Sequence, residues 1–118
     1  MTGASDPRAL LGAERQSVIE RLSVLERDFG DIVAAAGQSN ADDEHDPEGA
    51  TIAFERQHTA ALLSQARDQL RLVDAAISRL DAGRYGQCET CGQPIGAERL
   101  AARPTATRCI DCAGRSAS

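Results

Sequence analysis

Two stretches of the chain carry apolar residues at alternating intervals of three and four, apart from one interval of seven at the start of the first stretch. The members of the first stretch are Leu11, Val18, Leu22, Leu25, Phe29, Ile32 and Ala36. The members of the second stretch are Leu63, Ala66, Leu70, Val73, Ile77 and Leu80. Such intervals are typical of the a and d positions of a coiled coil. The pattern therefore predicts two long helices, each with a narrow apolar face.

Residues at the ends of the two stretches indicate where these helices begin and end. Pro7 suits the first turn of a helix, and Gly83 is a natural stop. The second helix has two candidate starts, one at Pro47 and one at Thr51. The expected elements are helices over about residues 6–36 and 51–82, with a tip loop over 37–50.

The short loop between the two stretches predicts how the helices pair. Helices joined by a connection of about a dozen residues usually pack against each other in antiparallel directions. We therefore expect an antiparallel coiled-coil hairpin within one chain, which would act as a monomer. A parallel coiled coil between two chains, with the loop as a hinge, remains an alternative at this point.

Composition and charge add detail to this all-α fold. The 118 residues include two Phe, one Tyr and no Trp, so the core should be thin. Residues 1–83 hold 8 Arg against 15 Asp and Glu, a net charge of −7, whereas residues 84–118 hold 5 Arg against 3 acidic residues, a net charge of +2. The acidic residues are densest in DDEHDPE, residues 42–48, where five carboxylates crowd into the predicted tip loop. An acidic tip could contact a partner, or it could simply keep the turn solvated.

Targeting signals are missing from the printed sequence. The first twelve residues contain no apolar segment of the kind found in signal peptides, and no stretch is apolar enough to span a membrane. We therefore expect a cytoplasmic protein without a membrane partner. Thiols in that compartment stay reduced, so closely spaced cysteines there favour metal binding over disulfides.

All four cysteines lie near the end of the chain, in two C-x-x-C pairs separated by seventeen residues. The predicted ligands are Cys88, Cys91, Cys109 and Cys112. This spacing is typical of a zinc site, and four thiolates form a closed tetrahedron around one structural Zn²⁺. A closed site has no position for a reacting water, so we expect no enzymatic activity. A redox dithiol and an iron–sulfur cluster are alternatives that the cysteines alone leave open. The expected domains are the hairpin over residues 1–83 and the zinc finger over residues 84–118.

The segment around these cysteines resembles the zinc finger of the DksA/TraR family of bacterial transcription factors. The matching residues are Tyr85, Gly86, Cys88, Cys91, Gly92, Ile95, Arg99, Leu100, Ala102, Arg103, Pro104, Cys109, Ile110 and Cys112. The resemblance covers residues 84–112 in detail and residues 6–83 by architecture. It implies a regulator that binds RNA polymerase directly, with the hairpin in the secondary channel of the enzyme and the finger on its outside.

The resemblance also assigns roles to individual residues. It implies contacts to the polymerase at the tip, for which the candidates are Asp43, Asp46, Glu48 and Ala50. On the finger the candidates are Arg99 and Arg103, although Arg99 could instead bond backbone carbonyls near the cysteines. Counted back from Cys88 without gaps, the family motif D-x-x-D-x-A falls on residues 45–50, where His45 replaces the first Asp. A shift by one residue keeps only the first Asp, at Asp46, so the tip is a variant in either register.

Two ligands that a transcription factor could bind are not expected here. Positions that are basic in the family and that help to hold guanosine tetraphosphate fall on Leu72 and Ala113, and only Arg103 is kept, so we expect a weak response or none. The finger has no basic run and no aromatic platform, so direct sequence-specific DNA binding is not expected either. Two other functions remain as alternatives, a coiled-coil adaptor clamped by zinc and an interaction protein that senses redox state or zinc.

Overall fold

The structure, a computed structural model, describes residues 6–38 and 47–116 of the chain and contains four α-helices. They are α1 (Pro7–Gln38), α2 (Pro47–Asp81), α3 (Ala97–Ala102) and α4 (Ile110–Ser116). Among the described residues, the β-structure consists of a single isolated bridge between Gln87 and Pro94. The fold is therefore all-α, as the sequence predicts.

The helix ends follow from local chemistry. Asp6 caps α1, because its carboxylate Oδ1 accepts a hydrogen bond from the Arg8 N–H at 3.1 Å. Helix α2 begins at Pro47, so the expected start at residue 51 is wrong and the alternative start is right. Proline fits a first helical position because its ring fixes φ and the N–H that it lacks would be unpaired there. Gly83, with φ of 78°, ends α2 in a left-handed turn.

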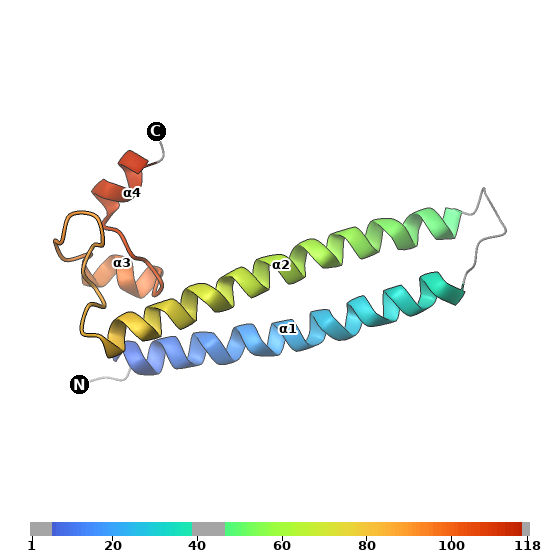
Figure 1. Ribbon diagram of the computed structural model, residues 1–118, viewed down its shortest axis with the longest axis horizontal. Coiled ribbons are helices and arrows are strands. Elements are labelled where there is room, and N and C mark those ends of the chain that lie inside the picture. The colour runs from blue at the N-terminus through green and yellow to red at the C-terminus, as the bar shows by residue number, and fades with distance from the viewer. Residues whose placement is uncertain (1–5, 39–46, 117–118) are drawn as a thin grey trace. The chain divides into compact units, whose positions relative to one another are not determined.

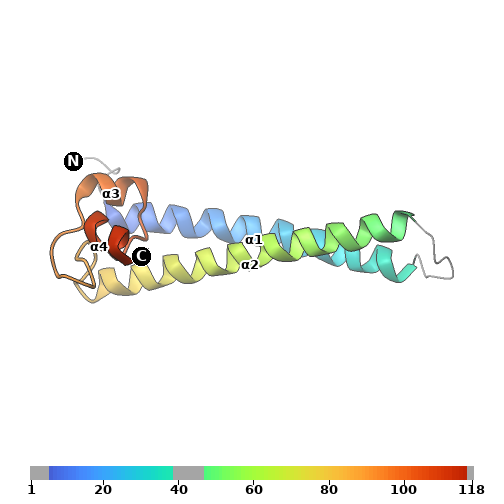
Figure 2. The same cartoon turned by 90° about the horizontal axis from the view of Figure 1, so that it is seen from above.

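The chain forms two compact units, and each unit contains part of α1 and part of α2. In the first unit, residues 1–17 with 70–118, Arg8 pairs with Asp81 at 2.6 Å and Arg15 pairs with Asp74 at 2.7 Å. Later residues of α1 thus meet earlier residues of α2. Within this unit the segments of α1 and α2 are antiparallel, and they lie side by side in Figures 1 and 2.

The second unit, residues 18–69, shows the same direction of pairing. Arg67 of α2 and Glu26 of α1 approach to 3.6 Å between Nη2 and Oε2. Both partners are more than half exposed, so this contact contributes little to stability. The pairing within one chain confirms the expected hairpin.

Apolar side chains at the expected positions form the core of each unit. Leu11 and Val73 are fully buried in the first unit, and Val18 is fully buried in the second. The other buried residues of the two helices are Leu22, Leu63, Ala66 and Ala76. Among the buried residues that the structure describes in these helices, Ala76 alone lies outside the predicted a and d pattern. None of the described helices is long and apolar enough to cross a membrane.

The finger has a small core of its own. Cys88, Ile95 and Cys112 are buried there, and Leu100 and Ala106 pack against them. Arg79 of α2 donates hydrogen bonds from its guanidinium Nη2 to the carbonyls of Arg84 at 3.2 Å and Gln87 at 2.5 Å. The end of α2 is thereby tied to the segment that enters the first cysteine pair.

Candidate metal centre

A tight turn presents the first cysteine pair. The Gly92 N–H donates to the Cys88 carbonyl at 2.9 Å, and the Cys88 N–H donates to the Gln93 carbonyl at 2.8 Å. Gly92 has φ of 79°, a conformation that glycine adopts without the strain a side chain would bring. The turn reverses the chain within five residues, so that Cys88 and Cys91 can face the same point.

The beginning of α4 presents the second pair. Cys109 directly precedes the helix, and the Ala113 N–H donates to the Cys109 carbonyl at 2.9 Å. Residues three apart in a helical turn lie on one face, so Cys109 and Cys112 point in a similar direction. Two different local structures therefore supply the two pairs of thiols.

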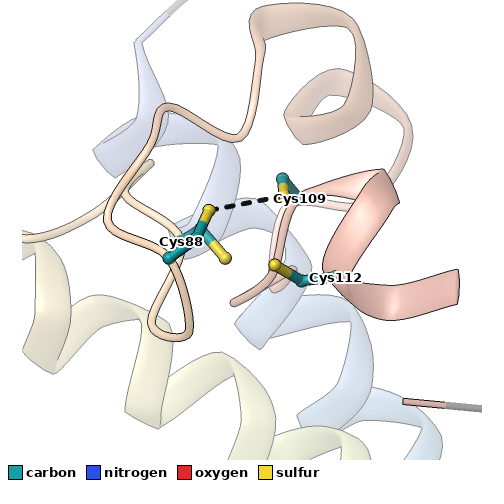
Figure 3. Close-up of side chains that lie close together, drawn as sticks. Cys88, Cys109 and Cys112 are labelled. Carbon is teal, nitrogen blue, oxygen red and sulfur yellow. Dashed lines mark hydrogen bonds between the residues drawn. The ribbon is translucent and has the colours of Figure 1, made fainter. Parts of the chain in front are cut away.

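The four sulfur atoms gather at one place. All of them lie within 4.8 Å of one another, and Cys91 Sγ lies 3.8 Å from Cys109 Sγ. In Figure 3 the labelled Cys88, Cys109 and Cys112 turn their sulfur atoms toward a common centre. A tetrahedron with Zn–S bonds of about 2.3 Å needs sulfur atoms about 3.8 Å apart. The cluster therefore fits one structural zinc ion.

The two buried thiols, Cys88 and Cys112, differ in their pKa. Burial favours the neutral form of Cys88, but hydrogen bonds from the backbone of Cys109, Cys91 and Thr90 lower the pKa of this thiol to about 6. The hydrogen bond with Cys109, together with burial, raises the pKa of Cys112 to about 12. Zinc binds thiolates, so its binding must displace the protons that such groups retain.

Two long-range hydrogen bonds hold the segment that leads into the second pair. The Tyr85 hydroxyl donates to the Pro104 carbonyl at 2.7 Å, and the Arg99 Nε–H donates to the Arg108 carbonyl at 2.9 Å. Arg99 thus has the local role that the sequence left as an alternative to partner contact. The role of Tyr85 was not predicted, because its partner lies 19 residues away in irregular structure.

Arg103, the other finger candidate, is exposed and lines an open groove of about 640 Å³. The remaining lining residues are Ile95, Gly96, Ala97, Glu98, Arg99, Ala102 and Ile110. Ile110 is 71% exposed, which is high for a large aliphatic side chain. This groove brings an apolar surface and the exposed basic side chain of Arg103 together.

The structure describes only two of the four residues predicted to make contacts at the tip. Asp43 and Asp46 lie outside the described residues. Glu48 falls in the first turn of α2, and Ala50 is exposed two residues later. The assignment of these four residues to partner contact stays a prediction.

Comparison with known proteins places these features in a family. The model described as prokaryotic dksA/traR C4-type zinc finger matches residues 83–116. The structure of transcription factor DksA2 from Pseudomonas aeruginosa aligns with 96% of this chain and 81% of its own, at 34% identity and a TM-score of 0.79.

Curated relatives match over shorter segments. The RNA polymerase-binding transcription factor DksA of Haemophilus influenzae is 46% identical over 46 residues, which are 39% of this chain and 32% of that protein. The uncharacterized protein YteA of Bacillus subtilis is 39% identical over 71 residues, 60% of this chain and 30% of its own. The DksA of Caulobacter vibrioides is 44% identical over 59 residues, 47% of this chain and 42% of its own. The matches therefore span less than half the length of these relatives.

Proposed function

This chain belongs to the DksA/TraR family of C4-type zinc-finger proteins, and on that premise we propose that it is a transcription regulator that binds RNA polymerase. One observation carries the proposal: the helical hairpin and the finger together align with DksA2 over 96% of the chain. The relatives named RNA polymerase-binding transcription factors support the same partner.

We further propose that the hairpin reaches the polymerase through its secondary channel. Helix α1 has 32 residues, which correspond to about 48 Å of helix. In the second unit, the residues that the structure describes belong to α1 and α2 alone, so this part of the hairpin is two helices thick, which favours entry into a narrow channel. The hairpin segment, residues 1–83, carries a net charge of −7, which favours a partner surface that is basic or that holds Mg²⁺.

We propose that the acidic tip is the part of the hairpin that acts on the polymerase. Asp43, Asp46 and Glu48 would bring carboxylates close to the catalytic centre of the polymerase, with Ala50 packing beside them. His45 stands where the family motif has an acid, so the tip carries an imidazole in place of one carboxylate. The direction of the effect on a promoter can therefore differ from that of other family members.

The finger is proposed to contact the outside of the polymerase. Arg103 and Ile110 offer a charge and an exposed aliphatic side chain beside the open groove. Zinc keeps this surface folded and takes no part in chemistry. Leu72 and Ala113 are not basic, so the response to guanosine tetraphosphate should be weak or absent.

Competition binding tests the proposal. The zinc-loaded protein is titrated against purified bacterial RNA polymerase, with and without a known occupant of the secondary channel. The tip variant Asp46→Lys/Glu48→Lys is compared with Asp28→Lys/Asp31→Lys, which makes the same change in charge at exposed positions of α1. We expect the competitor to displace the protein from the polymerase. Of the two charge-reversal variants, only the tip variant should lose its effect on transcription by that polymerase. Binding that the competitor leaves intact would contradict the channel route.

The adaptor function has one observation in its favour. Phe54 of α2 is 70% exposed, and its ring stacks on that of His58 with centroids 6.4 Å apart and planes at 4°. An exposed aromatic pair on a helix could hold a partner coiled coil. In that case Phe54→Ser would abolish partner binding, whereas charge reversal at the tip would leave it unchanged.

A further inference from the structure

The four cysteine residues of the metal centre differ in their exposure to solvent. The side chains of Cys88 and Cys112 are buried, at 3% and 6% exposure, within the apolar cluster of the finger. Cys91 is exposed and Cys109 is half-buried, and their sulfur atoms lie 3.8 Å apart. The centre therefore has a closed side, formed by Cys88 and Cys112, and an open edge, formed by Cys91 and Cys109.

A pair of hydrogen bonds joins the two chain segments that form the open edge. The Glu89 N–H donates to the Thr107 carbonyl at 2.8 Å. The Thr107 hydroxyl donates to the Glu89 carboxylate Oε2 at 3.1 Å. Glu89 and Thr107 are 18 residues apart, as are Cys91 and Cys109, and each lies two residues before the corresponding cysteine. The two pairs are thus neighbouring links between the same two segments.

We infer that Glu89 and Thr107 are positioning residues that hold the open edge of the metal centre together and so set the rate at which bound zinc is lost. A competing chelator should reach the ion from the side of the more exposed cysteines, which is the edge of Cys91 and Cys109. Separating these two sulfur atoms requires the two segments to move apart. The hydrogen bond from Thr107 to the Glu89 carboxylate opposes that movement. A carboxylate acceptor makes this bond stronger than one between two neutral groups.

This inference concerns the zinc centre alone and does not depend on binding to polymerase. Neither residue is a ligand, and neither packs in the apolar cluster. Sequence patterns did not indicate the pair, because Glu89 looks like any exposed residue between two cysteines and Thr107 has no motif of its own. Only the fold brings them together.

Zinc transfer to a chromogenic chelator tests the inference on the full chain. The zinc-loaded protein is mixed with excess 4-(2-pyridylazo)resorcinol, and the absorbance of the zinc complex gives the release rate. Thr107→Val removes the hydroxyl and nearly keeps the shape, and Thr107→Ser restores the hydroxyl. The matched control is Thr105→Val, a half-buried threonine in the same segment.

We expect Thr107→Val to release zinc about two- to tenfold faster, the range for the loss of one hydrogen bond. Thr107→Ser should stay close to the wild-type rate, and so should Thr105→Val. Glu89→Ala interrupts the same bond from the other side, and the double variant should be no faster than either single variant. Equal rates for Thr107→Val and Thr105→Val, or equal rates for Thr107→Val and Thr107→Ser, would overturn the inference.

Limited alkylation provides a readout that does not depend on these variants. Zinc-loaded wild-type protein is treated briefly with N-ethylmaleimide, and mass spectrometry locates the modified cysteines. Cys91 or Cys109 should be modified before Cys88 and Cys112. Initial modification of Cys88 or Cys112 would show that the ion is reached from the other side and would overturn the inference. If Thr107→Val fails to bind one zinc ion per chain, Glu89→Ala supplies the rate comparison.

Discussion

Removal of zinc should unfold the finger and leave α1 and α2 helical. Among its described residues the finger has only three that are buried, and two of them, Cys88 and Cys112, belong to the metal centre. So small an apolar core cannot offset the loss of chain entropy on folding. Binding of a structural zinc ion contributes about 10–16 kcal/mol in apparent terms, which is enough to change the balance. The helical hairpin keeps its own buried residues, such as Leu11 and Val18, and should survive.

The size of the expected change follows from the helix lengths. Helices α3 and α4 have 6 and 7 residues, whereas α1 and α2 have 32 and 35. Complete unfolding of the finger should therefore lower the helical ellipticity at 222 nm by about one sixth, because that signal grows with the number of helical residues.

Chelator titration with circular dichroism measures this change. The zinc-loaded protein is titrated with a high-affinity chelator, and ellipticity is recorded together with the zinc released. We expect a small loss of signal that is complete when one zinc ion per chain has left, and recovery when zinc is added back. A loss of half the signal or more would mean that the hairpin depends on the finger. No loss at all would mean that the finger folds without metal, and the reasoning would be refuted.

Three substitutions should lower the free energy of unfolding of the zinc-loaded protein, each for a different physical reason. Unfolding in denaturant measures each effect. Tyr85→Phe removes a single hydroxyl that donates at 2.7 Å and should cost about 0.5–1.5 kcal/mol. Val73→Ala opens a cavity at a fully buried position and should cost about 2 kcal/mol, whereas Val24→Ala at a 46% exposed position should cost less than about 0.5 kcal/mol. Gly86→Ala places a side chain at φ of 87° and should cost about 1–2 kcal/mol. Equal effects of Val73→Ala and Val24→Ala, or a neutral effect of Tyr85→Phe or Gly86→Ala, would contradict the corresponding contact.

The helices and the metal centre could be predicted because each depends on residues close together in the sequence. Alternation of apolar residues gave the hairpin, and two C-x-x-C pairs gave the zinc site. The start of α2 was misplaced because the regular apolar pattern begins only at Leu63 and leaves the first turns of the helix unmarked, while the preference of Pro47 for a first helical position decides where the helix begins. The burial of Ala76 was missed because a small residue beside the a and d positions gives no periodic signal.

Contacts between irregular segments could not be predicted in the same way. The hydrogen bonds from Tyr85 to Pro104 and from Thr107 to Glu89 join residues 18 or 19 positions apart, and neither pair lies on a regular helix face. Their partners are brought together only by the fold of the finger. Contacts at the tip depend on the partner as well as on this chain, so they remain predictions.

Site-specific crosslinking tests the proposed route into RNA polymerase most directly. A photoreactive benzoylphenylalanine is placed at Ala53, an exposed position of α2 close to the tip, and in a second sample at exposed Val24 of α1. The zinc-loaded protein is irradiated on purified polymerase, and the crosslinked peptides are identified. The proposal predicts that position 53 crosslinks to segments lining the secondary channel, and that a channel competitor abolishes the product. Crosslinks from position 53 only to the outer surface, or no crosslinks to polymerase from either position, would contradict it.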